Sequence, residues 1–138
     1  MDRALLDTDI LSEVLKAKNA NVVERVTAYK AAFEQLTISV ITVMEIVKGL
    51  HKMRRADALQ RFLDSLGASQ VLTFDQACAE IAGRIYGDLE RIGQPLGRAD
   101  PMIAATALQH GLVLVTGNTE HYQRIQAMGY PLKLDNWR

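Results

Sequence analysis

The chain alternates short apolar runs of strand character with longer segments in which apolar residues recur at helical spacing. This alternation constrains the fold more than any other feature, because a strand, a helix and a second strand in succession form a unit whose two strands are parallel. Repeated units of this kind cover both faces of a sheet with helices. The pattern predicts an α/β fold, a three-layer α/β/α sandwich with a four- or five-stranded, mostly parallel sheet.

The expected strands are short and cover residues 3–6, 36–40, 70–73, 112–115 and 132–134. Helices are expected at residues 10–15, 20–35, 42–50, 55–66, 75–91 and 100–110, followed by a short one after residue 117. Thr8 or Asp9 is expected to cap the first helix. Pro101 fits the first position of the helix that Asp100 opens.

Composition fits an ordinary folded domain, and residues 1–138 are expected to form a single one. Hydrophobic residues make up 49% of the chain, which has only 9 glycines and 3 prolines. The one cysteine, Cys78, has no partner in the chain, and its flanking residues predict a buried thiol on a helical face.

Charge and hydropathy limit the partners. The 16 basic and 16 acidic residues give a formal net charge of +0, so no global field steers the chain to nucleic acid or membrane. No apolar run approaches the roughly 20 residues that cross a bilayer, and the N-terminus lacks the pattern of a secretory signal. A cytoplasmic location and no membrane partner are expected.

Three widely separated acidic residues are the main chemical signal. Asp7 directly follows an apolar strand, Glu45 lies in the helix after the second strand, and Asp100 opens the helix that leads to the fourth. Because open α/β sheets bind ligands at the carboxyl ends of their strands, all three side chains are expected in one crevice.

Each acid also has an ordinary structural explanation. Glu45 falls three residues after Thr42, which is the spacing of a capping box. Asp100 before Pro101 is a good helix cap. Asp7 is harder to explain in this way, because Thr8 and Asp9 can cap the next helix without it. The coincidence of the three acids favours a functional role.

Clustered carboxylates repel one another and raise one another's pKa values unless a cation intervenes. Mg²⁺ is commonly held by one or two carboxylates together with water and substrate phosphate oxygens. Such a metal polarises a phosphoryl oxygen and activates a bound water, while a further carboxylate orients or deprotonates that water. The pattern therefore predicts metal-dependent phosphodiester chemistry.

Four blocks of sequence carry a family resemblance. They are residues 5–11 (LLDTDIL), 39–49 (SVITVMEIVKG), 97–105 (GRADPMIAA) and 115–119 (VTGNT), and residues 135–137 (DNW) add to them. Taken in order, and over the whole chain, they closely resemble the PIN-domain ribonucleases, specifically the VapC-type toxins of bacterial toxin–antitoxin pairs. Each block alone is degenerate, whereas the ordered set is specific.

The resemblance implies a PIN-like fold, RNA as substrate and Mg²⁺ as cofactor, with Mn²⁺ as the alternative ion. It implies that Asp7 and Asp100 are the principal metal ligands, and that Glu45 completes the catalytic acids by positioning or activating water. It also implies cleavage of structured RNA such as transfer RNA, a small VapB-like antitoxin that also binds operator DNA, and a homodimer.

One position departs from the family pattern. Many relatives have a fourth acidic residue shortly after the Asn of the fourth block, where this chain has His121 with Glu120 beside it. Asn118 or Glu120 would then act as an accessory ligand through a water, or the site would work with three acids. A lone histidine in the first turn of a helix is more often a surface or capping group than a catalyst.

Basic residues follow Glu45 in a cluster: Lys48, His51, Lys52, Arg54, Arg55 and Arg61. They are close enough in sequence to bind phosphates beside the cleaved bond, or they form a solvated helix face. Arg98 would contact phosphate or pair with a carboxylate. Aromatic residues are only 6% of the chain, so recognition by RNA shape is favoured over base stacking.

Two other functions are open on the sequence alone. Asp7 and Asp9 form the Asp-x-Asp pattern of haloacid-dehalogenase-like phosphatases, although no later lysine or paired acids accompany it and Glu45 would have no role. A non-catalytic binding module with the same fold would act through its partner surface. It predicts that Asp7→Asn leaves activity in cells unchanged, whereas a nuclease toxin would lose its toxicity.

Overall fold

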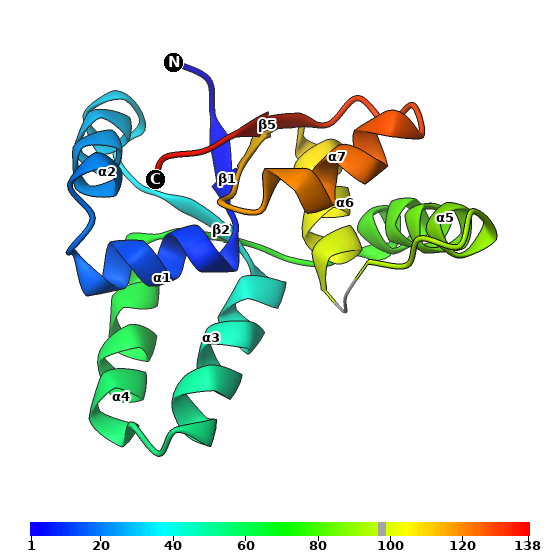
Figure 1. Cartoon of the computed structure of the whole chain (residues 1–138). Helices are drawn as coiled ribbons and strands as arrows, with labels where there is room; N and C mark the ends of the chain where they lie inside the picture. Colours follow the sequence, from blue (N-terminus) through cyan, green and yellow to red (C-terminus); the bar gives the residue numbers. More distant parts are fainter. Residues whose placement is uncertain (97–98) are drawn as a thin grey trace.

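A five-stranded parallel sheet forms the centre of the molecule (Figure 1). The computed structural model describes residues 1–96 and 99–138. The strands lie in the order β3-β2-β1-β4-β5, and all four neighbouring pairs are parallel. The predicted α/β/α sandwich is therefore confirmed, with five strands.

The strands are β1 (Ala4–Leu6), β2 (Thr37–Ser39), β3 (Gln70–Leu72), β4 (Val113–Val115) and β5 (Lys133–Asp135). The helices are α1 (Thr8–Lys16), α2 (Ala20–Phe33), α3 (Val40–Lys52), α4 (Ala56–Ser65), α5 (Gln76–Arg91), α6 (Asp100–His110) and α7 (Thr119–Ala127), with a 3₁₀ turn at Leu66–Ala68. These elements come in the expected order. The first four strands are each shorter than the apolar run that predicts them, and β5 has the expected length but begins one residue later.

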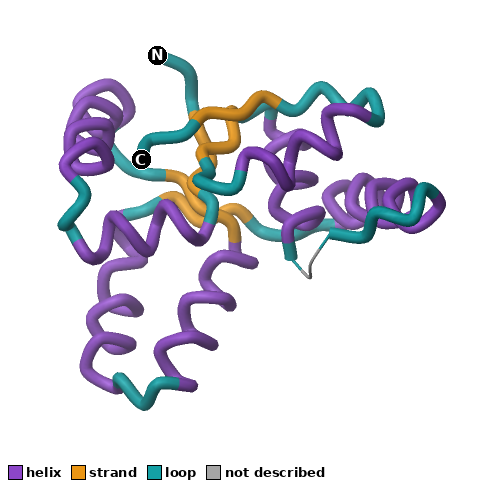
Figure 2. Tube along the Cα trace, in the orientation of Figure 1, coloured by secondary structure: helices purple, strands orange, loops and turns teal. Residues whose placement is uncertain are grey.

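The two helical layers follow from the alternation of side chains along a strand. In β1, Leu5 packs into a core built mainly from α5, α6 and α7. Ala4 and Leu6 point to the opposite face, where residues of α1, α2, α3 and α4 form the second core. Figure 2 shows the short strands between these two groups of helices. All three residues of β1 are buried, as expected for the central strand of a sheet covered on both faces.

Side chains at the helix starts explain where several helices begin. Asn19 caps α2, Ser39 caps α3 and Asp75 caps α5, each by accepting a hydrogen bond from a backbone N–H three residues later. Gly111 ends α6 in the left-handed conformation, with a φ of 64° that suits glycine. The α3–α4 hairpin extends away from the sheet in the lower part of Figure 1.

The chain changes direction across the sheet at β1. From β1 it proceeds to β2 and β3 on one side, and it then returns to place β4 and β5 on the other side. Helices α1 and α7, which follow β1 and β4, belong to opposite layers. The carboxyl ends of β1 and β4 therefore form a topological switch point, where open α/β sheets bind ligands.

Two further sequence expectations concern Cys78 and the membrane. Cys78 is free and fully buried, as predicted. Within residues 1–96 and 99–138, no helix combines the length and the apolar character that a membrane span requires.

Candidate metal and hydrolytic site

Asp7 lies at the switch point, directly after β1. The register pairs Leu6 with Val115, and the backbone N–H of Asp7 donates to Val115 O at 2.9 Å. Thr116, the next residue after β4, donates its hydroxyl to Asp7 Oδ2 at 2.8 Å. The two central strands thus deliver a carboxylate and a hydroxyl to the same point.

Asp7 is also the cap of α1, which corrects the expectation that Thr8 or Asp9 caps this helix. Its Oδ1 accepts the backbone N–H of Thr8 at 2.8 Å. Its Oδ2 accepts the hydroxyls of Thr116 and, at 3.1 Å, of Tyr122. A carboxylate has about four lone-pair sites, so these bonds leave about one free for a further donor or a cation.

Burial dominates the electrostatics of Asp7, whose relative exposure is 4%. Removal from water is the largest cause of the rise in its pKa from 3.8 to about 7, and the negative charges of Asp9 and Asp100 contribute to the same rise. The hydrogen bonds from Thr116 and Thr8 act in the opposite direction and only partly offset this rise. A cation beside Asp7 would supply the counter-charge that its surroundings lack.

Asp100 is the first residue of α6 and does not cap it. The cap position belongs to Ala99, and no side chain among the described residues makes a capping bond to this helix. Pro101 is the second helical residue and not the first. Burial raises the pKa of Asp100, although His121 and the Tyr122 hydroxyl lower it and Glu45 raises it. The structural explanation of this acid is therefore wrong, and its carboxylate faces the switch point.

Tyr122 joins these two acids. Its hydroxyl lies 3.1 Å from Asp7 Oδ2 and 3.3 Å from Asp100 Oδ1. The ring is fully buried in the core beside Ile125. Sequence reasoning missed this residue, because a tyrosine at helical spacing from an isoleucine predicts only core packing.

Glu45 reaches the site from α3, in which it is the sixth residue. It does not form a capping box, because α3 begins at Val40 and Ser39 caps it through the Thr42 N–H. Its Oε1 instead accepts the hydroxyl of Thr8 at 2.5 Å, and the Thr8 hydroxyl also lies 3.0 Å from that of Thr42. Thr8 thus orients the Glu45 carboxylate, and Thr42 contacts the Thr8 hydroxyl.

Asp9 has a bracing role that sequence reasoning did not assign. Its Oδ1 accepts the N–H of Ile10 and its Oδ2 accepts the N–H of Gly117, each at 2.8 Å. A Cβ on Gly117 would lie 2.6 Å from that Oδ2 and 2.7 Å from Nη1 of Arg138, so a larger residue here would displace these side chains. Arg138 contributes a guanidinium 3.9 Å from Asp9 and 3.1 Å from Glu13.

The residues at the place of a fourth acid lie after β4. Asn118 and Glu120 are exposed, and within the described ranges their side chains make no hydrogen bond or ion pair. His121 comes closer, with Nδ1 3.6 Å from Asp100 Oδ2. Arg98 lies outside the described residues.

The donor set fits a hard divalent cation. Asp7 and Asp100 offer carboxylate oxygens around one phenol, and Mg²⁺ is commonly bound by one or two carboxylates with water filling the other positions. In the described part of the chain, no three acidic, histidine or cysteine side chains gather closely enough to hold a metal together. The fit therefore rests on two carboxylates with water, and not on a closed protein cage.

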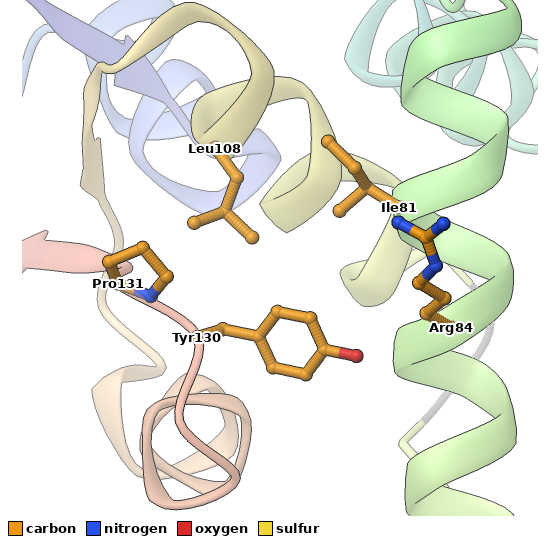
Figure 3. Close-up of a pocket in the computed structure, with 5 residues that line it drawn as sticks. All are labelled: Ile81, Arg84, Leu108, Tyr130 and Pro131. Carbon is orange, nitrogen blue, oxygen red and sulfur yellow. The ribbon is translucent and has the colours of Figure 1, made fainter.

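A hollow of about 300 Å³ lies elsewhere, between α5, α6 and the segment before β5 (Figure 3). It is lined by Ile81, Arg84, Leu108, Tyr130 and Pro131. Leu108 is about 12 Å along α6 from Asp100 at 1.5 Å per residue. None of these five lining residues is an acid that would activate water, so the open acidic edge is the better candidate for chemistry.

The chain is similar to characterised nucleases and toxins. The model of the PIN domain matches residues 4–126. The tRNA(fMet)-specific endonuclease VapC of Shigella flexneri is 33% identical over 141 aligned positions, which cover 99% of both chains. Toxin FitB of Neisseria gonorrhoeae is 33% identical over 124 positions, covering 83% of this chain and 87% of its own. The DNA-bound VapBC structure from Salmonella typhimurium contains a chain that superposes with a TM-score of 0.83, with full coverage of both chains and 30% identity.

A parallel α/β sheet with carboxylates at its switch point is an arrangement suited to hydrolysis at a bound metal ion. The similar proteins identify the family within this class. The chain belongs to the PIN-domain family, among its VapC-type ribonucleases. Enzymes of this type generally depend on a divalent metal ion. The family match decides against the haloacid-dehalogenase-like alternative. Asp9, the second acid of that pattern, is moreover engaged with the Gly117 backbone.

Proposed function

We propose that this chain is the toxin of a type II toxin–antitoxin pair and cleaves structured RNA as a Mg²⁺-dependent endoribonuclease, with Mn²⁺ as a substitute ion. The observation that carries the proposal is the placement of Asp7 and Asp100 around one buried hydroxyl at the switch point. Residues 1–138 would act as a single nuclease domain.

In this proposal Asp7 and Asp100 hold the metal ion, and Glu45 is the third catalytic acid. The bound metal ion would polarise a phosphoryl oxygen and lower the pKa of a coordinated water. Glu45 would orient that water or accept its proton, and Thr8 fixes the direction of its carboxylate. Asn118 and Glu120 are accessory candidates, because both are exposed at the same edge and free to approach substrate or water.

The RNA path would follow α3 outward from Glu45. Lys48 and Lys52 are three and seven residues after Glu45, so all three lie on one helix face, with the lysines about 4.5 and 10.5 Å further along the axis. Both lysines are exposed, and no ion pair engages either of them in the described part of the chain. Unpaired cations at this spacing suit the phosphates beside a cleaved bond.

Relatives suggest the substrate and the partners. A relative that matches along its full length is named for cleavage of tRNA(fMet), which makes transfer RNA the first substrate to test. Several structural neighbours are VapBC toxin–antitoxin complexes, some with DNA, which supports a VapB-like antitoxin for this chain. We further propose a homodimer that acts in the cytoplasm, where its RNA substrate is found.

The proposal is tested by incubating purified protein with bacterial transfer RNA in Mg²⁺, in Mn²⁺ and in EDTA. Asp7→Asn and Asp100→Asn should abolish discrete cleavage, as should EDTA. Asp64→Asn is the matched control, because Asp64 is an exposed carboxylate on α4 whose one hydrogen bond within residues 1–96 and 99–138 comes from the Gln60 amide. Wild-type protein that binds the antitoxin but never cleaves RNA would favour the non-catalytic binding module instead.

A further inference from the structure

We propose that Tyr122 is a positioning residue whose hydroxyl holds the Asp7 and Asp100 carboxylates together as one divalent-cation-binding pair. The inference rests on the proposed function, and it assigns a role to a residue that carries no charge and lies in the core. Among the described residues, Tyr122 is the one whose side chain makes a hydrogen bond to both acids.

The position of the Tyr122 hydroxyl is fixed by packing. The ring is fully buried in the same core cluster as Leu5, Ile103 and Ile125, which come from β1, α6 and α7. These elements also carry the two acids or lie next to them, since Asp7 follows β1 and Asp100 begins α6. Because the ring is packed tightly between these elements, its hydroxyl stays at a fixed position relative to both carboxylates.

The single Tyr122 hydroxyl does not satisfy both the Asp7 and the Asp100 carboxylates. A phenol has a single O–H and donates fully to one acceptor at a time, yet Asp7 Oδ2 and Asp100 Oδ1 both lie within 3.3 Å of this oxygen. Two acidic groups therefore converge on one donor. Such an arrangement has more acceptor than donor capacity, and a cation with oxygen preference satisfies the remainder.

A second buried tyrosine offers a matched control. Tyr29 is 1% exposed and Tyr122 is 0% exposed, but the partners of the Tyr29 hydroxyl are the N–H of Ala4 at 3.0 Å and the C=O of Ala4 at 3.3 Å. Tyr29→Phe and Tyr122→Phe each remove one buried hydroxyl with two contacts and keep the ring. Only Tyr122→Phe removes a contact to carboxylates, so only this variant should change metal binding.

The experiment measures the rise in melting temperature with increasing Mg²⁺ or Mn²⁺ for wild type and both variants, without RNA. Tyr122→Phe should weaken the apparent metal affinity about tenfold, the lower end of the effect of losing a group that orients metal ligands. Tyr29→Phe should lower the starting melting temperature and leave the affinity unchanged. Equal or tighter metal binding by Tyr122→Phe would overturn the inference.

Cleavage kinetics give a second readout. If Tyr122 acts only by positioning, Tyr122→Phe should need about tenfold more metal for half-maximal cleavage and recover nearly wild-type kcat at saturating metal. A kcat that remains low at saturation would contradict a positioning role.

A measurement on wild type guards against a variant that does not fold. Metal titration should produce a saturating near-ultraviolet difference spectrum of tyrosine, which persists in Tyr29→Phe. A metal that stabilises wild type without any tyrosine signal would overturn the inference. Failure of wild type to bind metal at all would instead contradict the proposed metal-dependent function, so the two failures are distinguishable.

Discussion

The two ends of β1 are closed by buried tyrosine hydroxyls with opposite chemistry. At the amino end, Tyr29 bonds the backbone of Ala4 and packs against Phe33 and Trp137, with ring centroids 4.8 and 5.7 Å away. At the carboxyl end, Tyr122 meets Asp7 and Asp100. The first end satisfies its polar groups internally, whereas the second gathers carboxylates whose negative charge needs a bound proton or an added cation for neutralisation.

This difference indicates that the carboxyl end of β1 is less stable than it could be because it carries functional groups. A buried carboxyl with a pKa of about 7 is unfavourable when it ionises, and a functional site is where such a cost persists. The aromatic end has no such group. Substitutions at the carboxyl end should therefore affect metal binding and cleavage most, and substitutions at the amino end should affect folding.

The largest expected effect is on catalysis by Asp7→Asn. Loss of a metal-binding carboxylate should reduce kcat/KM for RNA by about a thousandfold, which corresponds to about 4 kcal/mol of transition-state stabilisation. Single-turnover cleavage at saturating Mg²⁺ measures it. Retention of more than about a tenth of the activity would place the chemistry elsewhere, since tenfold is only about 1.4 kcal/mol.

The amino end should respond in stability alone. Trp137→Ala removes a ring that is 4% exposed and packs on Tyr29, and it should lower the free energy of unfolding by about 3 kcal/mol. Denaturant unfolding measures this loss. The folded fraction of the variant should keep wild-type metal affinity, and a change in that affinity would show that the two ends are not independent.

A pair of glycine substitutions tests the importance of close packing at the carboxyl end of β1. Gly117→Ala would place a Cβ 2.6 Å from Asp9 Oδ2, so the Asp9 side chain must move and its hydrogen bond to the turn after β4 is disturbed; cleavage should fall about tenfold, or about 1.4 kcal/mol. Gly83→Ala on α5 meets no atom within 4 Å and should stabilise the protein by about 0.5 to 1 kcal/mol. Cleavage assays and thermal melts on both variants check this contrast. Normal cleavage by Gly117→Ala would refute the importance of this turn.

The smallest effect is expected for the proposed RNA path along α3, which lies outside both ends of β1. The double variant Lys48→Gln/Lys52→Gln should raise KM several-fold and reduce the salt dependence of binding by about 0.7 to 0.9 per lost phosphate contact. The measurement is RNA affinity at several salt concentrations. Lys18→Gln/Lys30→Gln removes two exposed lysines elsewhere and should change neither quantity. An identical salt slope for both double variants would exclude a specific path along α3.

The sequence predicted the order of elements and the acids at one edge of the sheet because both depend on local patterns. The apolar runs before Asp7 and Gly117 give strands, and parallel strands place their ends together. The local explanations of the acids failed. Glu45 and Asp100 fit capping patterns but do not cap, whereas Asp7 caps α1, because each helix begins one to three residues before the position that the capping pattern requires.

The hydroxyl groups of the site could not be predicted in this way. Thr116 and Tyr122 contact Asp7 across 109 and 115 positions of the chain, so no spacing in the sequence links them. The Thr8 contact to Glu45 spans 37 positions. These contacts depend on the register of β1 with β4 and on the packing of α3 and α7, which only the folded chain determines.

The most direct test of the contrast between the two ends is the stability of metal-free wild type and Asp7→Asn at pH 5 and pH 8. In the folded protein Asp7 has a pKa of about 7, against 3.8 as its ordinary value, so from about pH 4 to 7 the folded state keeps a proton that the unfolded chain has released. Wild-type stability should therefore fall as pH rises through this window. Above pH 7 the loss should be complete. The free energy of unfolding should then be lower by roughly 2 kcal/mol, and the full pKa shift sets an upper limit of about 4 kcal/mol.

Asp7→Asn should lack this fall and be the more stable protein at pH 8. Mg²⁺ should restore the stability of wild type at pH 8 and leave that of Asp7→Asn unchanged. Parallel pH profiles for the two proteins, or equal stabilisation of both by Mg²⁺, would contradict the account of Asp7 as a buried carboxylate that a metal ion neutralises.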